Sequence, residues 1–169
     1  HCSSTGDHDL WFGENEHPEV GYLTDLLSRR AVDYVNRMAE GAKTGTPFML
    51  SLHYTAPHWP WETRDDAHVA AEVAKNLFHL DGGNVESYRR MIHHMDEGIG
   101  RIMEALKAHG LSENTIVVFT SDNGGERFSD SWPLVGGKMD LTEGGIRVPW
   151  IVHWPAQVPA GSTTAQHGM

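Results

Sequence analysis

The sequence predicts an α/β fold with a mainly parallel sheet flanked by helices. Two apolar runs, 47–54 and 115–119, have the length of buried strands, the second is rich in β-branched residues, and amphipathic helical patterns separate them. Consecutive strands that are joined by long helical crossovers run parallel. We therefore expect the loops after both strands to meet at one edge of the sheet, where open α/β folds bind their ligands.

Composition narrows the possible functions. The 169 residues can form one domain with a sizeable core, and 13 Lys+Arg against 23 Asp+Glu give a net charge of −10, which disfavours nucleic-acid partners. No apolar stretch reaches the length of a membrane span, and the single Cys2 excludes an internal disulfide. The 12 histidines form no His-Glu-x-x-His pattern that would indicate zinc.

The first half of the chain begins with residues 1–21, whose lack of periodicity predicts irregular surface structure. A helix is expected from an N-cap at Thr24 to a stop at Gly41. Its apolar positions are Leu27, Ala31, Tyr34, Val35 and Met38.

The strand at 47–54 leads into Ala56-Pro57-His58-Trp59-Pro60-Trp61. Because proline fixes its own φ and restrains the residue before it, this segment is predicted to be a stiff loop that holds the His58 imidazole in one direction. The alternative is that the tryptophans pack in the core or at its rim and His58 merely lies between them.

Helical patterns fill the region between the two strands. Residues 66–80 show a weak pattern, and a stronger one starts from Asn84 as a cap and ends at Gly110 as the residue after the helix. The apolar face of the second helix consists of Tyr88, Met91, Ile92, Met95, Ile99, Ile102, Met103 and Leu106. His93 and His94 lie beside this face and receive no role.

The second strand ends at Thr120-Ser121-Asp122-Asn123-Gly124-Gly125-Glu126. A carboxylate and an amide that follow a buried strand provide oxygen donors suited to a hard cation. The alternative is a simple tight turn, because Asn-Gly after a strand is a strong turn signal.

Glycines surround the next basic residues, Lys138 and Arg147, within 134–149. They would allow the backbone to approach a bound group, and Lys138 supplies a compact positive charge for an anionic oxygen. A glycine-rich surface loop with solvated charges explains the composition equally well. Residues 148–154 are a final strand candidate, which Pro149 moves toward a sheet edge or a strand start.

Together these segments resemble the sulfatase family of the alkaline phosphatase superfamily. The matching stretches are 22–27, 47–60, 95–100, 120–124 and 137–149, in the family's order. The resemblance implies part of an alkaline-phosphatase-like sandwich and a sulfuric ester hydrolase activity.

The resemblance also implies site residues and a cofactor. It makes Asp122 and Asn123 ligands of a calcium ion, and it makes His58 and Lys138 catalytic residues that contact the sulfate group. Two-zinc phosphatases of the superfamily usually have His after the Asp, so Asn123 favours sulfate esters.

The family's nucleophile is a formylglycine made from the Cys or Ser of a Cys/Ser-x-Pro-x-Arg motif. Cys2 is followed by Ser3-Ser4-Thr5 and does not match it. We therefore expect residues 1–169 to be a partial catalytic domain, truncated at both ends and without a second domain. Its formylglycine is expected in a missing N-terminal part, so the isolated chain is expected to be inactive.

Two alternatives remain open: a phosphodiester or phosphonate hydrolase of the same superfamily, and a non-catalytic relative that binds an anion. The expected partner is a small sulfate ester or a sulfated glycan, for which Trp59, Trp61 and Trp132 could line a subsite. Exposed edges of the truncated domain are expected to favour association. The family's usual location is secreted, periplasmic or lysosomal.

Overall fold

A computed structural model describes residues 9–68 and 83–165. The chain divides into two units, His1–Ala105 and Leu106–Met169, which are described separately. The described elements include both helices and short strands, and the predicted α/β class is confirmed. Among the described helices, none combines the length and the apolar character that a membrane crossing requires. Most of the helical pattern predicted at 66–80, and Cys2, lie outside the described residues.

The first unit opens with a small hairpin where irregular structure was predicted. Strand β1 (Trp11–Phe12) pairs antiparallel with β2 (Asn15–Glu16). The turn between them contains Gly13, whose φ of 62° suits a residue without a side chain. Two-residue strands carry too few alternating positions to give a periodic signal, which is why the pattern missed them.

Helix α1 (Leu23–Lys43) confirms the first predicted helix but not its end signals. Thr24 is buried inside the first turn, and Tyr22 occupies the N-cap position without a side-chain cap bond. Gly41 continues the helix, and the left-handed residue that follows the helix end is Gly45, with φ of 95°. The buried residues of α1 are Thr24, Leu26, Ser28, Ala31, Val35 and Ala39.

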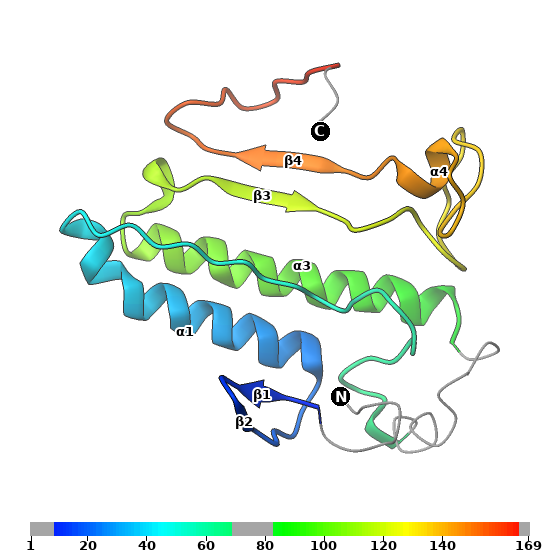
Figure 1. Ribbon diagram of the computed structural model, residues 1–169, viewed down its shortest axis with the longest axis horizontal. Helices are drawn as coiled ribbons and strands as arrows, with labels where there is room; N and C mark the ends of the chain where they lie inside the picture. The colour runs from blue at the N-terminus through cyan, green and yellow to red at the C-terminus, as the bar shows by residue number, and fades with distance from the viewer. Residues whose placement is uncertain (1–8, 69–82, 166–169) are drawn as a thin grey trace. The chain divides into compact units, whose positions relative to one another are not determined.

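Residues 47–54 belong to no strand ladder in the described part of the chain, so the predicted strand is wrong there. The segment instead runs along α1 (Figure 1). The Tyr34 hydroxyl donates to the Met49 carbonyl at 3.0 Å, and the rings of Tyr34 and Phe48 meet edge to face at 6.0 Å. The apolar run reflects contact with a helix rather than strand pairing.

Helix α3 (Val85–Ala108) confirms the second predicted helix together with both of its caps. Asn84 Oδ1 accepts the N–H of Ser87 at 2.9 Å, as an N-cap side chain does. Beyond the helix, Gly110 has φ of 72°, and its N–H and that of the next residue bond back to carbonyls of the last turn. The buried face consists of Met91, His94, Gly98, Ala105 and Leu106.

Helices α1 and α3 lie side by side and run in the same direction (Figure 1). Gly98 makes this close approach possible, because a Cβ at that position would overlap Ser28 Oγ and stand 2.8 Å from the Tyr54 hydroxyl. Those two hydroxyl groups share a hydrogen bond of 2.8 Å. The contact therefore ties both helices to the end of the 47–54 segment.

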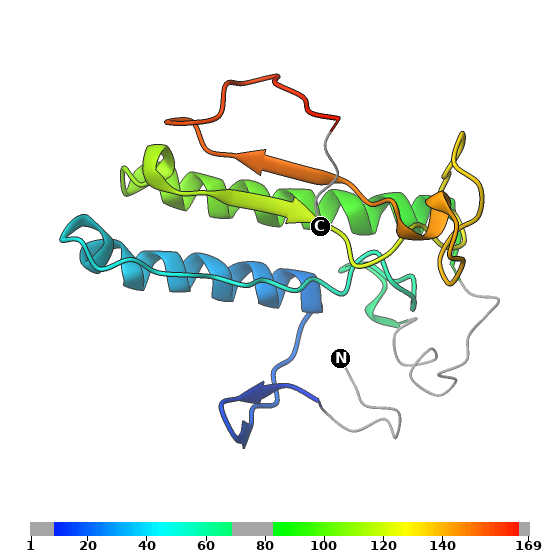
Figure 2. The same ribbon diagram turned by 45° about the horizontal axis from the view of Figure 1, so that its top comes forward.

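The second unit consists of the 3₁₀ turn η1 (Ser112–Asn114), β3 (Val117–Thr120), α4 (Glu143–Ile146) and β4 (Trp150–His153). Strands β3 and β4 confirm two predicted strands, and β4 starts directly after Pro149 as expected. They pair antiparallel, with Val118 opposite Val152 and Thr120 opposite Trp150. Figure 2 shows the same two arrows running in opposite directions. The predicted parallel pairing is therefore not found in the described residues.

One face of the β3–β4 ladder is exposed, although the sequence predicted a strand buried on both faces. Val118 is 47% exposed and Trp150 is 63% exposed, and Ile116, which precedes β3, is 54% exposed. Alternation places these side chains with Val152 on one face. None of the described residues covers this face well enough to bury it.

Candidate functional site

The loop after β3 carries the predicted metal ligands Asp122 and Asn123. The side-chain Nδ2 of Asn123 donates to Asp122 Oδ1 at 2.6 Å, and Ser121 Oγ donates to the backbone carbonyl of Asn123 at 3.0 Å. The loop therefore bends at Asp122 and Asn123. It leaves acceptor capacity for a cation, because a carboxylate has two oxygens and an amide oxygen has two lone pairs.

Three glycine pairs, which we call the glycine junction, join the loops of the second unit: 124–125, 136–137 and 144–145. The N–H of Gly124 donates to the Gly145 carbonyl at 2.8 Å, and the N–H of Lys138 donates to the Gly125 carbonyl at 2.8 Å. A Cβ on Gly124 would overlap the Gly144 carbonyl oxygen. The sequence anticipated a close backbone approach to a bound group, and the structure shows these loops approaching each other.

Lys138 extends from this junction beside an open cavity of about 450 Å³. The cavity is also lined by Glu126, Ser129 and Trp132. The Lys138 ammonium lies 3.3 Å from Glu126 Oε2, and its side chain is 23% exposed. An ammonium has three donors, so the ion pair with Glu126 leaves Lys138 able to bind an anion as well.

His58 lies in the first unit, on the loop that the sequence predicted to be stiff. Its Nδ1 is 2.7 Å from the carbonyl oxygen of Trp59, and the rings of the two residues lie 5.5 Å apart. A carbonyl oxygen only accepts, so Nδ1 must carry the proton of this hydrogen bond. Nε2 is consequently the nitrogen that can act on a ligand. The prediction that His58 shares a site with Asp122 and Asn123 stays a prediction, because it concerns two separate units.

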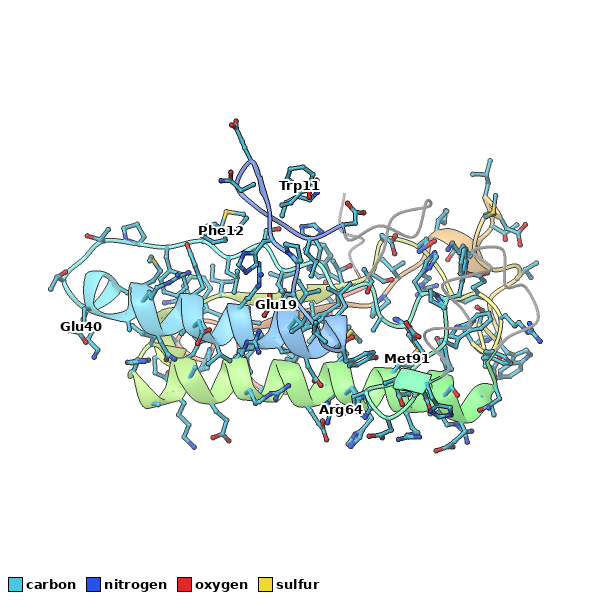
Figure 3. The ribbon with its side chains drawn as sticks, turned by 90° about the horizontal axis from the view of Figure 1, so that it is seen from below. Trp11, Phe12, Glu19, Glu40, Arg64 and Met91 are labelled. Atoms are coloured by element: carbon cyan, nitrogen blue, oxygen red, sulfur yellow. The ribbon has the colours of Figure 1, made fainter. Side chains whose placement is uncertain are left out.

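A charged cluster surrounds Arg64, which follows His58 in the first unit. Arg64 Nη2 lies 2.9 Å from Asp25 Oδ1 of α1 and 2.9 Å from Glu97 Oε2 of α3. The hydrogen bond from Arg64 lowers the pKa of Glu97. Figure 3 labels Arg64 at this position beside α3.

His94, to which the sequence assigned no role, is buried next to this cluster. Only 6% of it is exposed, and its ring meets the Tyr22 ring edge to face at 5.7 Å. Among the described residues, neither His94 Nδ1 nor the Tyr22 hydroxyl has a hydrogen-bond partner. Burial lowers the pKa of His94, because the charged imidazolium would lose its hydration.

Comparison with known proteins assigns the chain to a family. The model of the Sulfatase family matches residues 4–168. This chain belongs to the sulfatase family. The resemblance drawn from the ordered motifs is thereby confirmed.

Several known sulfatases are similar to this chain. It is 35% identical to human Arylsulfatase D over 171 residues, which covers 95% of this chain and 25% of the relative. It is 33% identical over 150 residues to the uncharacterized sulfatase YdeN of Escherichia coli (strain K12), covering 86% of this chain and 25% of that protein. The sulfatase chain thus spans about a quarter of the length of these curated relatives.

A solved structure supports the alkaline-phosphatase-like fold of this sulfatase chain. The crystal structure of Ps i-CgsB in complex with k-i-k-neocarrahexaose matches with a TM-score of 0.72 and 37% sequence identity. The match covers 88% of this chain and 31% of that chain.

The residues of this sulfatase chain fit part of a calcium site. Asp122 and Asn123 offer oxygen donors only, the set that a hard cation prefers over zinc. Within residues 9–68 and 83–165, no group of three His, Cys, Asp or Glu side chains is arranged to hold a metal ion. Calcium takes about six to eight oxygen ligands, so these two residues would provide only a minority of the shell.

Sequence reasoning assigned no role to three residues that lie near the candidate residues: Glu126 beside Lys138 in the second unit, and Arg64 and His94 in the first unit. The pair formed by Lys138 and Glu126 spans a long loop, and Arg64 is far in sequence from both of its carboxylates. No local spacing rule connects such positions. His94 could have been found, because it lies three residues from Met91 and four from Gly98, on the buried helical face.

Proposed function

We propose that this chain forms part of the active site of a sulfuric ester hydrolase. His58 and Lys138 contact the sulfate group, and Asp122 and Asn123 provide two oxygen ligands of a calcium ion. Its relatives are sulfatases, which supports the reaction class at the level of the family. The substrate is a small sulfate ester or a sulfated glycan, and one solved relative is in complex with k-i-k-neocarrahexaose.

The observation that carries the proposal is the backbone bond between Lys138 and Gly125. This 2.8 Å bond fixes the start of the Lys138 side chain against the loop that holds Asp122 and Asn123. A sulfate oxygen that approaches the metal ligands would therefore find an ammonium anchored to the same loop. Positive charge held in place before the reaction stabilises negative charge that develops on sulfate oxygens.

His58 would act on the leaving oxygen. With Nδ1–H committed to the Trp59 carbonyl, a protonated imidazole presents its second proton at Nε2. Donating that proton to the bridging oxygen makes the alcohol a better leaving group. Lys138 would offset charge on the same bridging oxygen until the proton arrives.

The cofactors add what these side chains lack. Formylglycine, from a Cys/Ser-x-Pro-x-Arg motif that this sequence does not contain, would supply the attacking hydroxyl, and calcium would neutralise the anionic sulfate. The isolated chain is therefore proposed to lack turnover.

The test uses a polypeptide that joins this sequence to a segment with the formylglycine motif. We expect it to hydrolyse an aryl sulfate at least about 100-fold faster than the matched aryl phosphate. Replacing His58 or Lys138 by Ala should reduce kcat/KM by about 100-fold or more, while Arg147→Ala serves as a control cation of the same unit. Faster phosphate hydrolysis would favour the phosphodiesterase alternative, and turnover by the isolated chain would contradict its proposed inactivity.

A further inference from the structure

The loop that carries His58 has a defined internal structure between Thr55 and Asp66, and we call this segment the His58 loop. The N–H of His58 donates to the Thr55 carbonyl at 2.8 Å, and the N–H of Asp66 donates to the Thr63 carbonyl at 3.1 Å. Thr63 is buried, and its hydroxyl donates to Asp66 Oδ2 at 2.8 Å. The loop is thus closed by a turn at each end.

Arg64 connects this loop to both long helices of the first unit. It follows the buried Thr63, and one nitrogen of its guanidinium reaches Asp25 of α1 and Glu97 of α3, each at 2.9 Å. Asp65 adds a second link, an ion pair with Arg90 of α3. The guanidinium is the point in the loop where contacts to α1 and α3 converge.

Arg64 could hold α1 and α3 to each other, or it could hold the His58 loop to the two helices. A second ion pair between the helices distinguishes these roles. Arg101 of α3 also reaches Asp25, at 3.4 Å. An ion pair between α1 and α3 therefore remains without Arg64, whereas its own bonds attach the loop to each helix. The side chains of Asp25 and Glu97 are partly exposed, at 31% and 40%, so each ion pair alone contributes little to stability. What matters more is that a single guanidinium binds both carboxylates at once.

Stiff residues connect the anchor to the imidazole. Pro57 and Pro60 each fix a backbone angle between the turn at Thr55 and the turn at Thr63. Trp59 holds the imidazole by its carbonyl, at 2.7 Å from Nδ1. A displacement of the anchored end would therefore be transmitted to His58 rather than absorbed along the way.

We propose that Arg64 is a positioning residue, which holds the His58 loop against α1 and α3 so that the imidazole keeps one orientation. The inference rests on the proposed function only for its catalytic meaning, since the orientation of His58 can be measured without turnover. Arg64 itself contacts neither substrate nor metal in this scheme.

The experiment records ¹⁵N NMR spectra of the His58 ring and hydrogen exchange of the loop amides in the 169-residue chain. For Arg64→Met we expect exchange of the His58 and Glu62 amides to accelerate about five- to thirtyfold, with loss of the Nδ1–H tautomer signature. Arg101→Met, the matched control that removes the other cation from Asp25, should leave both signals unchanged. Arg64→Lys should restore them in part, because an ammonium replaces the charge but not the fork geometry.

Two results would overturn the proposal: unchanged His58 signals in Arg64→Met, or equal changes in Arg64→Met and Arg101→Met. If Arg64→Met does not fold, Glu97→Gln removes one of its two carboxylates and must change the same signals in the same direction. In the formylglycine-containing polypeptide, Arg64→Met should lower kcat more than it changes KM. An active His58→Ala variant would instead contradict the proposed function, while the NMR result for Arg64 would stand.

Discussion

Gly98 of α3 lies directly against Ser28 of α1, and the contact leaves no space for a side chain. Ser28 cannot move away easily, because its hydroxyl bonds to the Thr24 carbonyl at 2.7 Å and to Tyr54 at 2.8 Å. We therefore expect Gly98→Ala to reduce the free energy of unfolding by about 1–3 kcal/mol. Urea denaturation measures this change.

Gly100, in the same helix, is the matched control. Nothing lies within 4 Å of the position that its Cβ would occupy. Gly100→Ala should therefore raise the free energy of unfolding by about 0.5–1 kcal/mol, through the helix propensity of alanine. Equal effects of the two substitutions would contradict the packing of α1 on α3.

His94 predicts a loss of stability at acidic pH. Burial lowers the pKa of His94, and the positive charges of Arg64 and Arg90 lower it further. The negative charges of Glu97 and Asp25 raise it, but the net shift is downward. The unfolded chain, with a His pKa near 6.5, then binds a proton more readily than the folded chain, so the stabilisation is complete above that pH and declines as the pH falls below it. Urea denaturation between about pH 7.5 and pH 5.5 should show a shallower decline for His94→Gln. Parallel curves for the two proteins would reject this origin of the pH dependence.

The ion pair of Lys138 with Glu126 predicts competition with an anion. Neutralising the carboxylate frees the ammonium, so Glu126→Gln should strengthen binding of inorganic sulfate about two- to fivefold, whereas Lys138→Met should weaken it. NMR titration of backbone amides near Lys138 measures both. Glu143→Gln, which removes a comparable 3.3 Å pair with Arg147, is the control and should have no effect.

The oxygen donors of Asp122 predict a calcium-dependent stability. In the formylglycine-containing polypeptide, excess Ca²⁺ should raise Tm because the ion binds only the folded state. Asp122→Ala should increase the Ca²⁺ concentration needed by at least about tenfold. Asp130→Ala, whose carboxylate accepts the N–H of Trp132 at 3.0 Å, should leave the calcium response intact. If the two variants respond alike, Asp122 is not a ligand.

The exposed face of the β3–β4 ladder predicts self-association of the isolated chain. Ile116→Thr combined with Val118→Thr keeps β-branched side chains but removes apolar surface. We expect this variant to stay monomeric to higher concentrations in sedimentation-velocity experiments. Val20→Thr, at a residue that is 94% exposed and outside the ladder, should behave like the unmodified chain.

The helices could be predicted from the sequence because their information is local. Asn84 and Gly110 mark the ends of α3 through bonds to neighbouring residues, and periodic spacing identifies the buried face. The segment 47–54 shows the limit of this approach. Its composition suits a strand, but a strand also needs a ladder partner, which local sequence does not specify.

In the candidate site, too, local features could be predicted from the sequence and long-range contacts could not. The bend at Asp122 and Asn123 follows a strand that ends in polar residues and glycine, a pattern from which a change of chain direction could be predicted. The bonds of Arg64 depend on how two helices and a loop pack together, which no pattern in the sequence encodes. The prediction that His58 joins Asp122 in one site was drawn from parallel pairing of the two predicted strands, which the described residues do not show, and it stays a prediction.

The glycine junction has an evolutionary consequence. Because the Lys138 N–H bonds to the Gly125 carbonyl, the intervening residues 126–137 form a loop whose two ends are held together by main chain. The entropy of closing such a loop changes only slowly with its length. Insertions and deletions there can reshape the cavity beside Trp132 while Asp122, Asn123 and Lys138 keep their places. Under the proposed function, substrate preference would then diversify without disturbing the two proposed calcium ligands.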